Sequence, residues 1–179
     1  IVINVFYVVN AIFNGVASGT QPMISFSYGE NDHKKIRQVL RYALITVAGI
    51  AVVVYIVLFF GADGIAKIFN SQGEERLQAL ASQGIKLYFI SSLFSGFNLL
   101  FSGYFAASNR GLYAQIITIL RGVVLIIPIA YLFAFLWQIT GLWLATPAAE
   151  SITLAVALTI FFATRKSLTT LEAPAYVKE

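Results

Sequence analysis

Five long and mostly apolar runs constrain this sequence more than any other feature, and the first of them, Ile1 to Tyr28, contains no charged residue. About 20 residues of α-helix, each rising about 1.5 Å, cross the roughly 30 Å hydrocarbon core of a bilayer. Each run is close to or above that length, so we expect spans over residues 3–28, 42–60, 87–108, 112–136 and 141–164. The sequence therefore predicts an all-α, polytopic transmembrane helical bundle, with a membrane lobe over 1–165 and a tail over 166–179.

Transmembrane strands are the alternative to helices in such a chain. A barrel strand alternates apolar and polar residues over about ten positions, whereas the stretch VAGIAVVVYIVLFF is apolar at nearly every position. The chain is 59% hydrophobic and 11% charged, which lies outside the usual balance of soluble domains. A helix also satisfies its own backbone hydrogen bonds inside lipid, so helices are favoured.

Lysine and arginine residues lie at the ends of the apolar runs rather than on one polar face. We therefore expect membrane lipids as partners and no nucleic acid. One set of alternate connections carries three basic residues, Lys67, Arg76 and Lys86. The other set carries nine when Arg121, which lies near the start of the fourth span on the same side, is included. These are Lys34, Lys35, Arg37, Arg41, Arg110, Arg121, Arg165, Lys166 and Lys178. Basic residues favour cytoplasmic connections, so this split predicts an external N-terminus and a cytoplasmic C-terminus.

The segment YGENDHKKIRQVLRY joins the first two runs. It predicts a tight turn at Gly29, a helix N-cap at Asn31 or Asp32, and a basic amphipathic turn before the second span. His33 is the only histidine, and the chain has no cysteine. The usual acid, base and nucleophile sets cannot be assembled, and the GxSxG, HExxH, P-loop and GxGxxG motifs are absent. The sequence predicts no enzyme, no catalytic residue, no metal site and no cofactor.

Polar residues recur at helical spacing inside the first and third spans. In the first span the spacings are four, four, three and four, through Asn10, Asn14, Ser18, Gln21 and Ser25. The third span has Ser91, Ser95, Asn98 and Ser102, flanked by Gly96 and Gly103. Lipid does not stabilise such groups, so we expect these faces to meet protein or an aqueous cavity. The serines and glycines suggest helix packing, and the asparagines suggest cavity lining. The candidate substrate pathway comprises Asn10, Asn14, Gln21, Ser95, Asn98 and Glu150.

Glu150 is the carboxylate that lies well inside a span. A charge there is costly, so such a group is usually paired, protonated or exposed to a channel. Arg121 is a possible ion-pair partner, although straight helices would separate the two by about 9 Å along the membrane axis. A structural ion pair and a role in the substrate pathway both stay open. Proline disrupts helical hydrogen bonding, so we expect hinges or kinks at Pro22, Pro128 and Pro147.

The stretch GTQPMISFSYGENDHKKIRQVLRYA resembles a signature of the multidrug and toxic compound extrusion (MATE) family, in which Gly-x-Gln-Pro precedes a Ser-x-x-Tyr-Gly turn. Downstream, GYFAASNRG, LRGVVLIIPIAYLF and GLWLATPAAE are similar to the tenth-to-twelfth helix region of that family. Together the matches span most of residues 15–150 and look most like the bacterial DinF-like multidrug branch. The resemblance implies that the five spans are helices eight to twelve, in the C-terminal lobe of a twelve-helix fold.

This resemblance implies a secondary antiporter in the cell inner (plasma) membrane that exports small organic, often cationic, compounds, driven by proton or sodium influx. It also implies an N-terminal lobe as partner, and because residue 1 is not Met we expect the chain to be part of a longer protein. Some sodium-coupled members carry acids in helices seven and ten, and proton-coupled members of this branch use an aspartate in helix one. The third span has no acid, so the coupling ion is unassigned. Pro22 would be a hinge beside the cavity.

Two other functions are alternatives. A lipid-linked or polysaccharide flippase of the same superfamily would place several basic residues in its cavity to bind phosphates, and only Arg121 is available here. A non-transporting membrane subunit would pack its polar faces against other helices, with no aqueous cavity between them.

Overall fold

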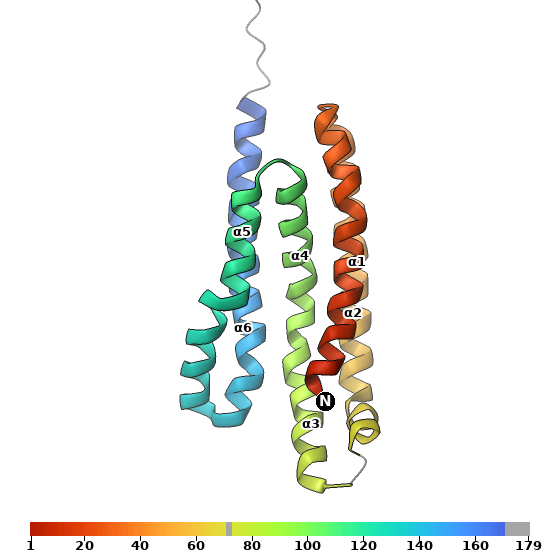
Figure 1. The fold of residues 1–179 in the computed structure, drawn as a ribbon, viewed down its shortest axis with the longest axis vertical. Coiled ribbons are helices and arrows are strands. Elements are labelled where there is room, and N and C mark those ends of the chain that lie inside the picture. The colour runs from red at the N-terminus through yellow and green to blue at the C-terminus, as the bar shows by residue number, and fades with distance from the viewer. Residues whose placement is uncertain (71–72, 171–179) are drawn as a thin grey trace, which may run out of the picture.

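The computed structural model describes the backbone of residues 1–70 and 73–170, and their side chains as far as Thr164. Within this part every regular element is a helix, which confirms the predicted all-α class. Figure 1 shows long helices running side by side, up and down the molecule. In chain order they are α1 (Val2–Gly29), α2 (His33–Phe69), α3 (Glu75–Tyr88), a 3-10 turn (Phe89–Ser91), α4 (Ser92–Ala107), α5 (Gly111–Ile119), a π-helical segment (Leu120–Val124) and α6 (Ile126–Thr170).

Four helical stretches are long and apolar enough to cross a bilayer: Val2–Gly29, His33–Phe69, Glu75–Ala107 and Gly111–Thr164. The last stretch has 54 residues, and the backbone dihedral angles of Trp137 and Gln138 inside it are not helical. Figure 1 shows that the chain reverses in this region, so α6 consists of two antiparallel halves, residues 126–136 and 139–170. About 20 residues suffice for one crossing. The described chain therefore has five spans, as the sequence predicts.

The reversal inside α6 depends on a close approach between its two halves. Gln138 adopts a positive φ of 52°, which turns the chain back on itself. Three residues later, Gly141 lies so close to the backbone of Phe133 that a Cβ atom at position 141 would overlap the Phe133 carbonyl group. Glycine is the residue without a Cβ, so it alone permits this approach.

A second departure from α-helical geometry lies between α5 and α6. In the π-helical segment the Leu125 amide donates to the Leu120 carbonyl at 3.0 Å, five residues back. Pro128 follows within one turn, where it has no amide hydrogen for Val124 and its ring crowds the preceding turn, which favours wider winding. The helix bends in this region in Figure 1. By contrast, α1 continues through Pro22 and α6 continues through Pro147.

The turn between α1 and α2 follows the sequence closely. α1 ends at Gly29, and Asn31 takes a positive φ of 56°. Asp32 is the N-cap of α2, because its Oδ1 accepts from the Lys35 amide at 3.0 Å. An N-cap at Asn31 or Asp32 was predicted, and Asp32 is the residue that takes this role.

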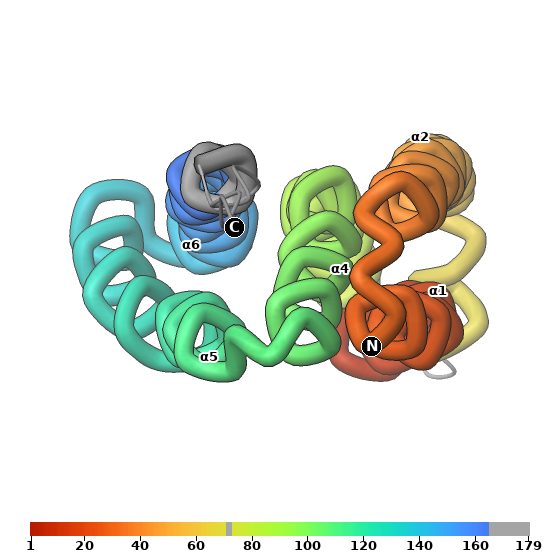
Figure 2. The backbone as a smooth tube through the Cα atoms, turned by 90° about the horizontal axis from the view of Figure 1, so that it is seen from above, coloured from red at the N-terminus to blue at the C-terminus, as the bar shows by residue number. Residues whose placement is uncertain are grey.

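The main packing contact lies where α1, α2 and α4 meet. Gly96 of α4 is covered by Phe13 of α1 and Val47 of α2, and an added Cβ would lie 2.6 Å from the Phe13 ring. Gly103, two turns further along α4, faces the Gln21 side chain at a similarly close 3.0 Å. The role predicted for these glycines in close helix packing is confirmed. Seen from above, α4 lies between the α1–α2 pair and the α5–α6 pair (Figure 2).

The predicted third span, 87–108, leaves out most of α3, because charged residues interrupt the sequence before Leu87. A polar cluster attaches this amphipathic helix to α2. Ser82 donates to Asp63 Oδ1, Lys86 Nζ lies 3.3 Å from Asp63 Oδ2, and Gln78 donates to the Asp63 carbonyl at 2.8 Å. These bonds accompany the extension of α2 to Phe69, beyond the predicted end at residue 60. At the other end of the chain, residues 171–179 of the predicted tail lie outside the described residues.

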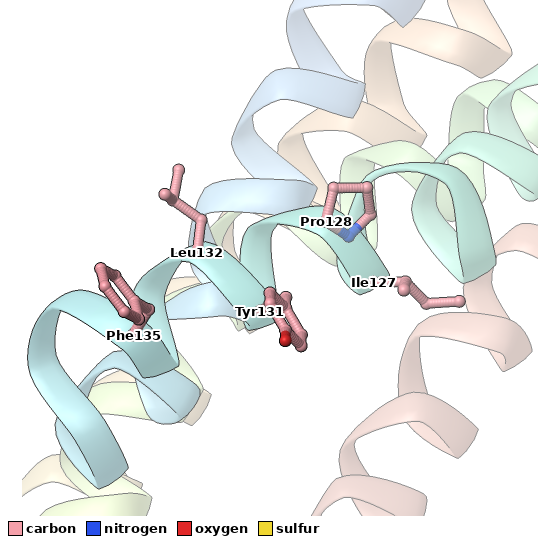
Figure 3. A pocket seen from close by; sticks show the side chains of 5 residues that line it. All are labelled: Ile127, Pro128, Tyr131, Leu132 and Phe135. Carbon is pink, nitrogen blue, oxygen red and sulfur yellow. The ribbon is translucent and has the colours of Figure 1, made fainter.

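Large apolar side chains cover the outside of the molecule. Phe60, Tyr131 and Phe135 are each more than 80% exposed. An aqueous surface rarely carries contiguous apolar area of this kind, whereas a bilayer-facing surface requires it. On the first half of α6 an open apolar groove is lined by Ile127, Pro128, Tyr131, Leu132 and Phe135 (Figure 3).

Candidate functional site

Three side chains from different spans meet in the interior and form the central polar cluster: Asn98 of α4, Arg121 of the π-helical segment and Glu150 of α6. Arg121 donates to Glu150 Oε1 twice, from Nη2 at 2.6 Å and from Nε at 3.1 Å. Asn98 Nδ2 donates to the other carboxylate oxygen, Oε2, at 2.7 Å and to the Glu150 backbone carbonyl at 2.9 Å. The Glu150 carboxylate therefore receives three hydrogen bonds from protein.

The central polar cluster is almost completely withdrawn from solvent. Asn98 is fully buried, and the side chains of Arg121 and Glu150 are 12% and 7% exposed. Desolvation of two charges is costly, and their attraction offsets this cost only when the geometry is good and further hydrogen bonds are made. The paired arginine bonds and the asparagine amide meet that requirement. Removal of either charge would leave the other buried without compensation.

Backbone geometry brings the two charges to the same depth. More residues separate Arg121 from the Trp137–Gln138 reversal than separate Glu150 from it. In two straight antiparallel helices, the two side chains would therefore lie at different depths. The bend after the π-helical segment shortens the axial reach of the first half of the hairpin, and the long arginine side chain covers the rest. The separation of about 9 Å estimated from straight helices thus does not occur.

Tyr88 and Thr146 extend the central polar cluster toward α3. The two side chains lie next to each other, and the Tyr88 hydroxyl interacts electrostatically with Glu150 and Arg121. Asn98 Oδ1 is buried and makes no hydrogen bond within the described residues. Buried amide oxygens usually accept a hydrogen bond, so the cluster retains one unused acceptor.

The other predicted pathway residues lie apart from Arg121. Asn10 and Asn14 donate to backbone carbonyls of their own helix, at Phe6 and Asn10 respectively, and Asn14 is exposed on the surface of the lobe. Gln21 is half-buried against α4. Ser95 is buried one turn before Asn98 on α4. Of the six candidates, the structure therefore joins Asn98 and Glu150 directly, with Ser95 next to them along the helix.

No group of three or more histidine, aspartate or glutamate side chains that could hold a metal ion occurs in the described part of the chain. The MatE family model matches residues 1–132 of the 179. This chain belongs to the MATE family.

Curated MATE relatives are similar over most of the chain. The multidrug export protein MepA of Staphylococcus saprophyticus is 27% identical over 158 residues, which is 88% of this chain and 34% of that protein. MepA of Staphylococcus aureus strain bovine RF122 is 28% identical over the same length. The chain spans about a third of the length of these relatives.

Solved MATE structures share the fold. An inward-facing multidrug resistance MATE transporter superposes with a TM-score of 0.86 at 19% identity, over 97% of this chain and 40% of that one. An outward-facing structure gives 0.82, also at 19% identity, over 96% of this chain and 39% of that one. The Vibrio cholerae MATE transporter VcmN, in its bent form, gives 0.75 at 21% identity, over 93% and 39%. The family and fold predictions are confirmed: the chain is a multi-pass membrane protein of a transporter family and not an enzyme.

Tyr88 and Thr146, which lie beside the central polar cluster, were not among the residues predicted from the sequence. A spacing signal was present for both. Tyr88 precedes Ser91, Ser95 and Asn98 at helical intervals of three, four and three, and Thr146 lies four residues before Glu150. Tyr88 therefore falls on the same helix face as Asn98, and Thr146 on the same face as Glu150.

Proposed function

We propose that this chain forms the C-terminal lobe of a MATE secondary antiporter that exports small organic, often cationic, compounds, driven by influx of protons or sodium ions. The central polar cluster is the observation that carries this proposal. It is a buried, charged connection between three membrane spans, in a chain whose curated relatives are named as multidrug exporters. Ionisable side chains inside membrane spans commonly mark substrate or ion pathways.

Within this function, Glu150 contributes to cation recognition or gating without being the sole coupling acid. In the described state its carboxylate is occupied by Arg121 and Asn98. A cationic substrate would compete with the Arg121 guanidinium for the same oxygens. Exchange between the two partners would loosen the contact between the π-helical segment and α6, which links substrate binding to helix movement.

Asn10 and Asn14 would line the cavity shared with an N-terminal lobe. They occur on a face of α1 that the described helices leave partly uncovered, and Asn14 is exposed there. Gln21 lies on the α4 side of α1, next to Pro22, so it would transmit movement of α1 to Gly103 and α4. Pro22 would act as a hinge, because the helix continues through it with one backbone hydrogen bond fewer.

The two alternative functions have less support. A flippase for lipid-linked phosphates would need free cationic groups in its cavity, and Arg121 is already neutralised by Glu150. A subunit that only packs against partners would not need a buried charge pair. Apolar residues of similar volume could replace such a pair without loss of stability. Residence in the cell inner membrane with a cytoplasmic C-terminus accords with the basic residues gathered beside the α1–α2 turn.

Transport by the complete protein in proteoliposomes tests this proposal. We expect ethidium to move against an imposed proton or sodium gradient with wild-type protein, and to show no net movement without a gradient. The rate of ethidium transport, normalised to the amount of folded protein, should fall to a small fraction in E150Q and be partly retained in R121K. Absence of movement under both gradients with a panel of lipophilic cations would contradict the antiporter. Unchanged transport by E150Q would contradict the role of Glu150.

A further inference from the structure

One side of α2 carries a continuous exposed stripe that changes character along its length. The exposed positions follow helical spacing, so they lie in a single row along the helix. The stripe begins with polar and basic residues and continues as apolar residues: Lys34, Gln38, Arg41, Ile45, Gly49, Val52 and Ile56. The opposite side of α2, which includes Ala43, Val47 and Ala51, is buried. The stripe therefore faces away from the packed interior.

The basic residues at this end of the stripe form no ion pair with any side chain that the structure describes. Lys34 and Arg41 belong to the stripe, Arg37 lies beside it on the same helix, and all three are exposed. The two ion pairs found within the described side chains, Lys86–Asp63 and Arg121–Glu150, do not include them. Asp32 lies nearby, but its carboxylate caps the α2 backbone at Lys35. Three cationic groups thus remain available within about two turns of helix.

Lys35 differs from its neighbours and supplies an internal comparison. Its ammonium group lies 5.5 Å from the centroid of the Phe26 ring of α1, in cation–π geometry. It therefore points toward α1, while Lys34 and Arg41 continue the outer row. Lys35 is thus a basic residue in the same helical turn as Lys34 whose charge points toward α1 and not along the stripe, so it can serve as a control.

The apolar end of the stripe has the length of one leaflet. From Ile45 to Ile56 the helix rises about 16 Å at 1.5 Å per residue, which is close to half of the roughly 30 Å hydrocarbon core. Ile45, Val52 and Ile56 are 59%, 50% and 48% exposed. Gly49 lies between them, and an added Cβ there would meet nothing within 4 Å. The row therefore contains a shallow notch between two aliphatic side chains.

We propose that this stripe is a binding site for an anionic phospholipid. The phosphate group contacts Lys34, Arg37 and Arg41, and one acyl chain lies along Ile45 and Val52 and fills the notch at Gly49. Charge complementarity selects the headgroup, because basic residues beside a membrane attract anionic lipid. Continuity of the basic and apolar parts on one helix face selects a lipid over a soluble phosphate. The site does not depend on the transported substrate or the coupling ion.

Binding of phosphatidylglycerol and phosphatidylcholine of equal chain length to the complete protein, measured by native mass spectrometry, tests the headgroup contact. Each basic residue near a membrane surface contributes enough to change affinity about fivefold. We expect wild-type protein to prefer phosphatidylglycerol, and K34Q, R37Q and R41Q each to weaken that preference about fivefold. K35Q should change it by less than about twofold, because its charge is directed at Phe26.

The acyl contact is tested separately by G49F, which fills the notch without overlapping any neighbouring atom at its Cβ. This variant should weaken binding of long-chain phosphatidylglycerol and leave binding of glycerol 3-phosphate unchanged. Equal lipid binding by G49F and wild type would overturn the site, as would an effect of K35Q as large as that of K34Q. Absence of any preference for phosphatidylglycerol in wild-type protein would overturn it as well. Single substitutions on an exposed helix face keep the fold intact, so each result is interpretable.

Discussion

Glu150 is held by more hydrogen bonds than any other carboxylate in the described part of the chain. Arg121 occupies one of its oxygens and Asn98 occupies the other. This arrangement explains how a charge is tolerated at a position where apolar side chains surround it. It also ties α4, the π-helical segment and α6 through a single carboxylate, so that a change at one residue is felt by three helices.

At this scale we expect the two charges to stabilise the protein only as a pair. E150Q or R121L alone leaves one buried charge uncompensated and should cost about 3 to 5 kcal/mol of stability. The double variant R121L/E150L removes both charges and should recover most of that loss, because replacing a buried pair by apolar residues is often neutral. The fraction of complete protein that stays monodisperse after heating measures this. A double variant less stable than either single variant would contradict the expectation.

At the scale of elements, two departures from α-helical geometry shape the second half of the molecule. The π-helical segment bends the fourth span, and the reversal at Trp137–Gln138 returns the chain antiparallel to it. Both depend on residues with special backbone properties, Pro128 and Gly141. The central polar cluster forms because these two features set the register between Arg121 and Glu150.

Gly141 should therefore tolerate no side chain. In G141A the new methyl group overlaps the Phe133 carbonyl, so the two halves of α6 must separate. We expect a loss of about 1 to 3 kcal/mol of stability, as for other overpacked sites. G64A is the matched control, because nothing lies within 4 Å of a Cβ atom there. Equal thermal stability of the two variants would show that the close approach is not required.

Span number, helical class and an N-cap at Asn31 or Asp32 followed from apolar runs, charge positions and turn residues, and the structure selects Asp32. The contact between Arg121 and Glu150 did not, because straight-helix geometry cannot anticipate a π-helical segment. α3 was missed because Glu75, Arg76 and Lys86 keep its apolar residues from forming one long uncharged run, and a search for such runs does not detect amphipathic helices. Tyr88 and Thr146 were missed because a single hydroxyl group inside a span does not by itself indicate a functional site when its neighbours in space are unknown.

At the scale of the whole molecule, the helix connections fall alternately at two ends (Figure 1). The α1–α2 turn, the α4–α5 turn and the C-terminal end of α6 share one end, and the α2–α3 connection and the Trp137–Gln138 reversal share the other. The basic residues of the loops concentrate at the first end. Arg121 lies in the interior, paired with Glu150, and so does not belong to either end of the molecule. Without it, the basic residues of the connections are still more numerous at the first end.

We expect this bias to set the orientation of the complete protein. The chain has no cysteine, so single cysteines at Lys34 and Glu74, both exposed, report on opposite ends. A membrane-impermeant thiol reagent added to intact cells should label the position at Glu74 and spare the position at Lys34. Permeabilised cells supply the control in which both react. Labelling of Lys34 alone from outside would reverse the predicted topology.

The reversal at Trp137–Gln138 also bears on how the chain enters the membrane during synthesis. Arg121 alone in the middle of the fourth span would cost about 2.5 to 3.5 kcal/mol on insertion scales. If the fourth and fifth spans enter as a hairpin, Glu150 arrives with it and the two charges partition as a neutral pair. A glycosylation reporter fused after Gln138 should therefore show incomplete insertion of the fourth span, and R121L should restore it; full insertion without the fifth span would contradict this. Insertion of the fourth span would then depend on Glu150, a residue of the fifth span that is synthesised later.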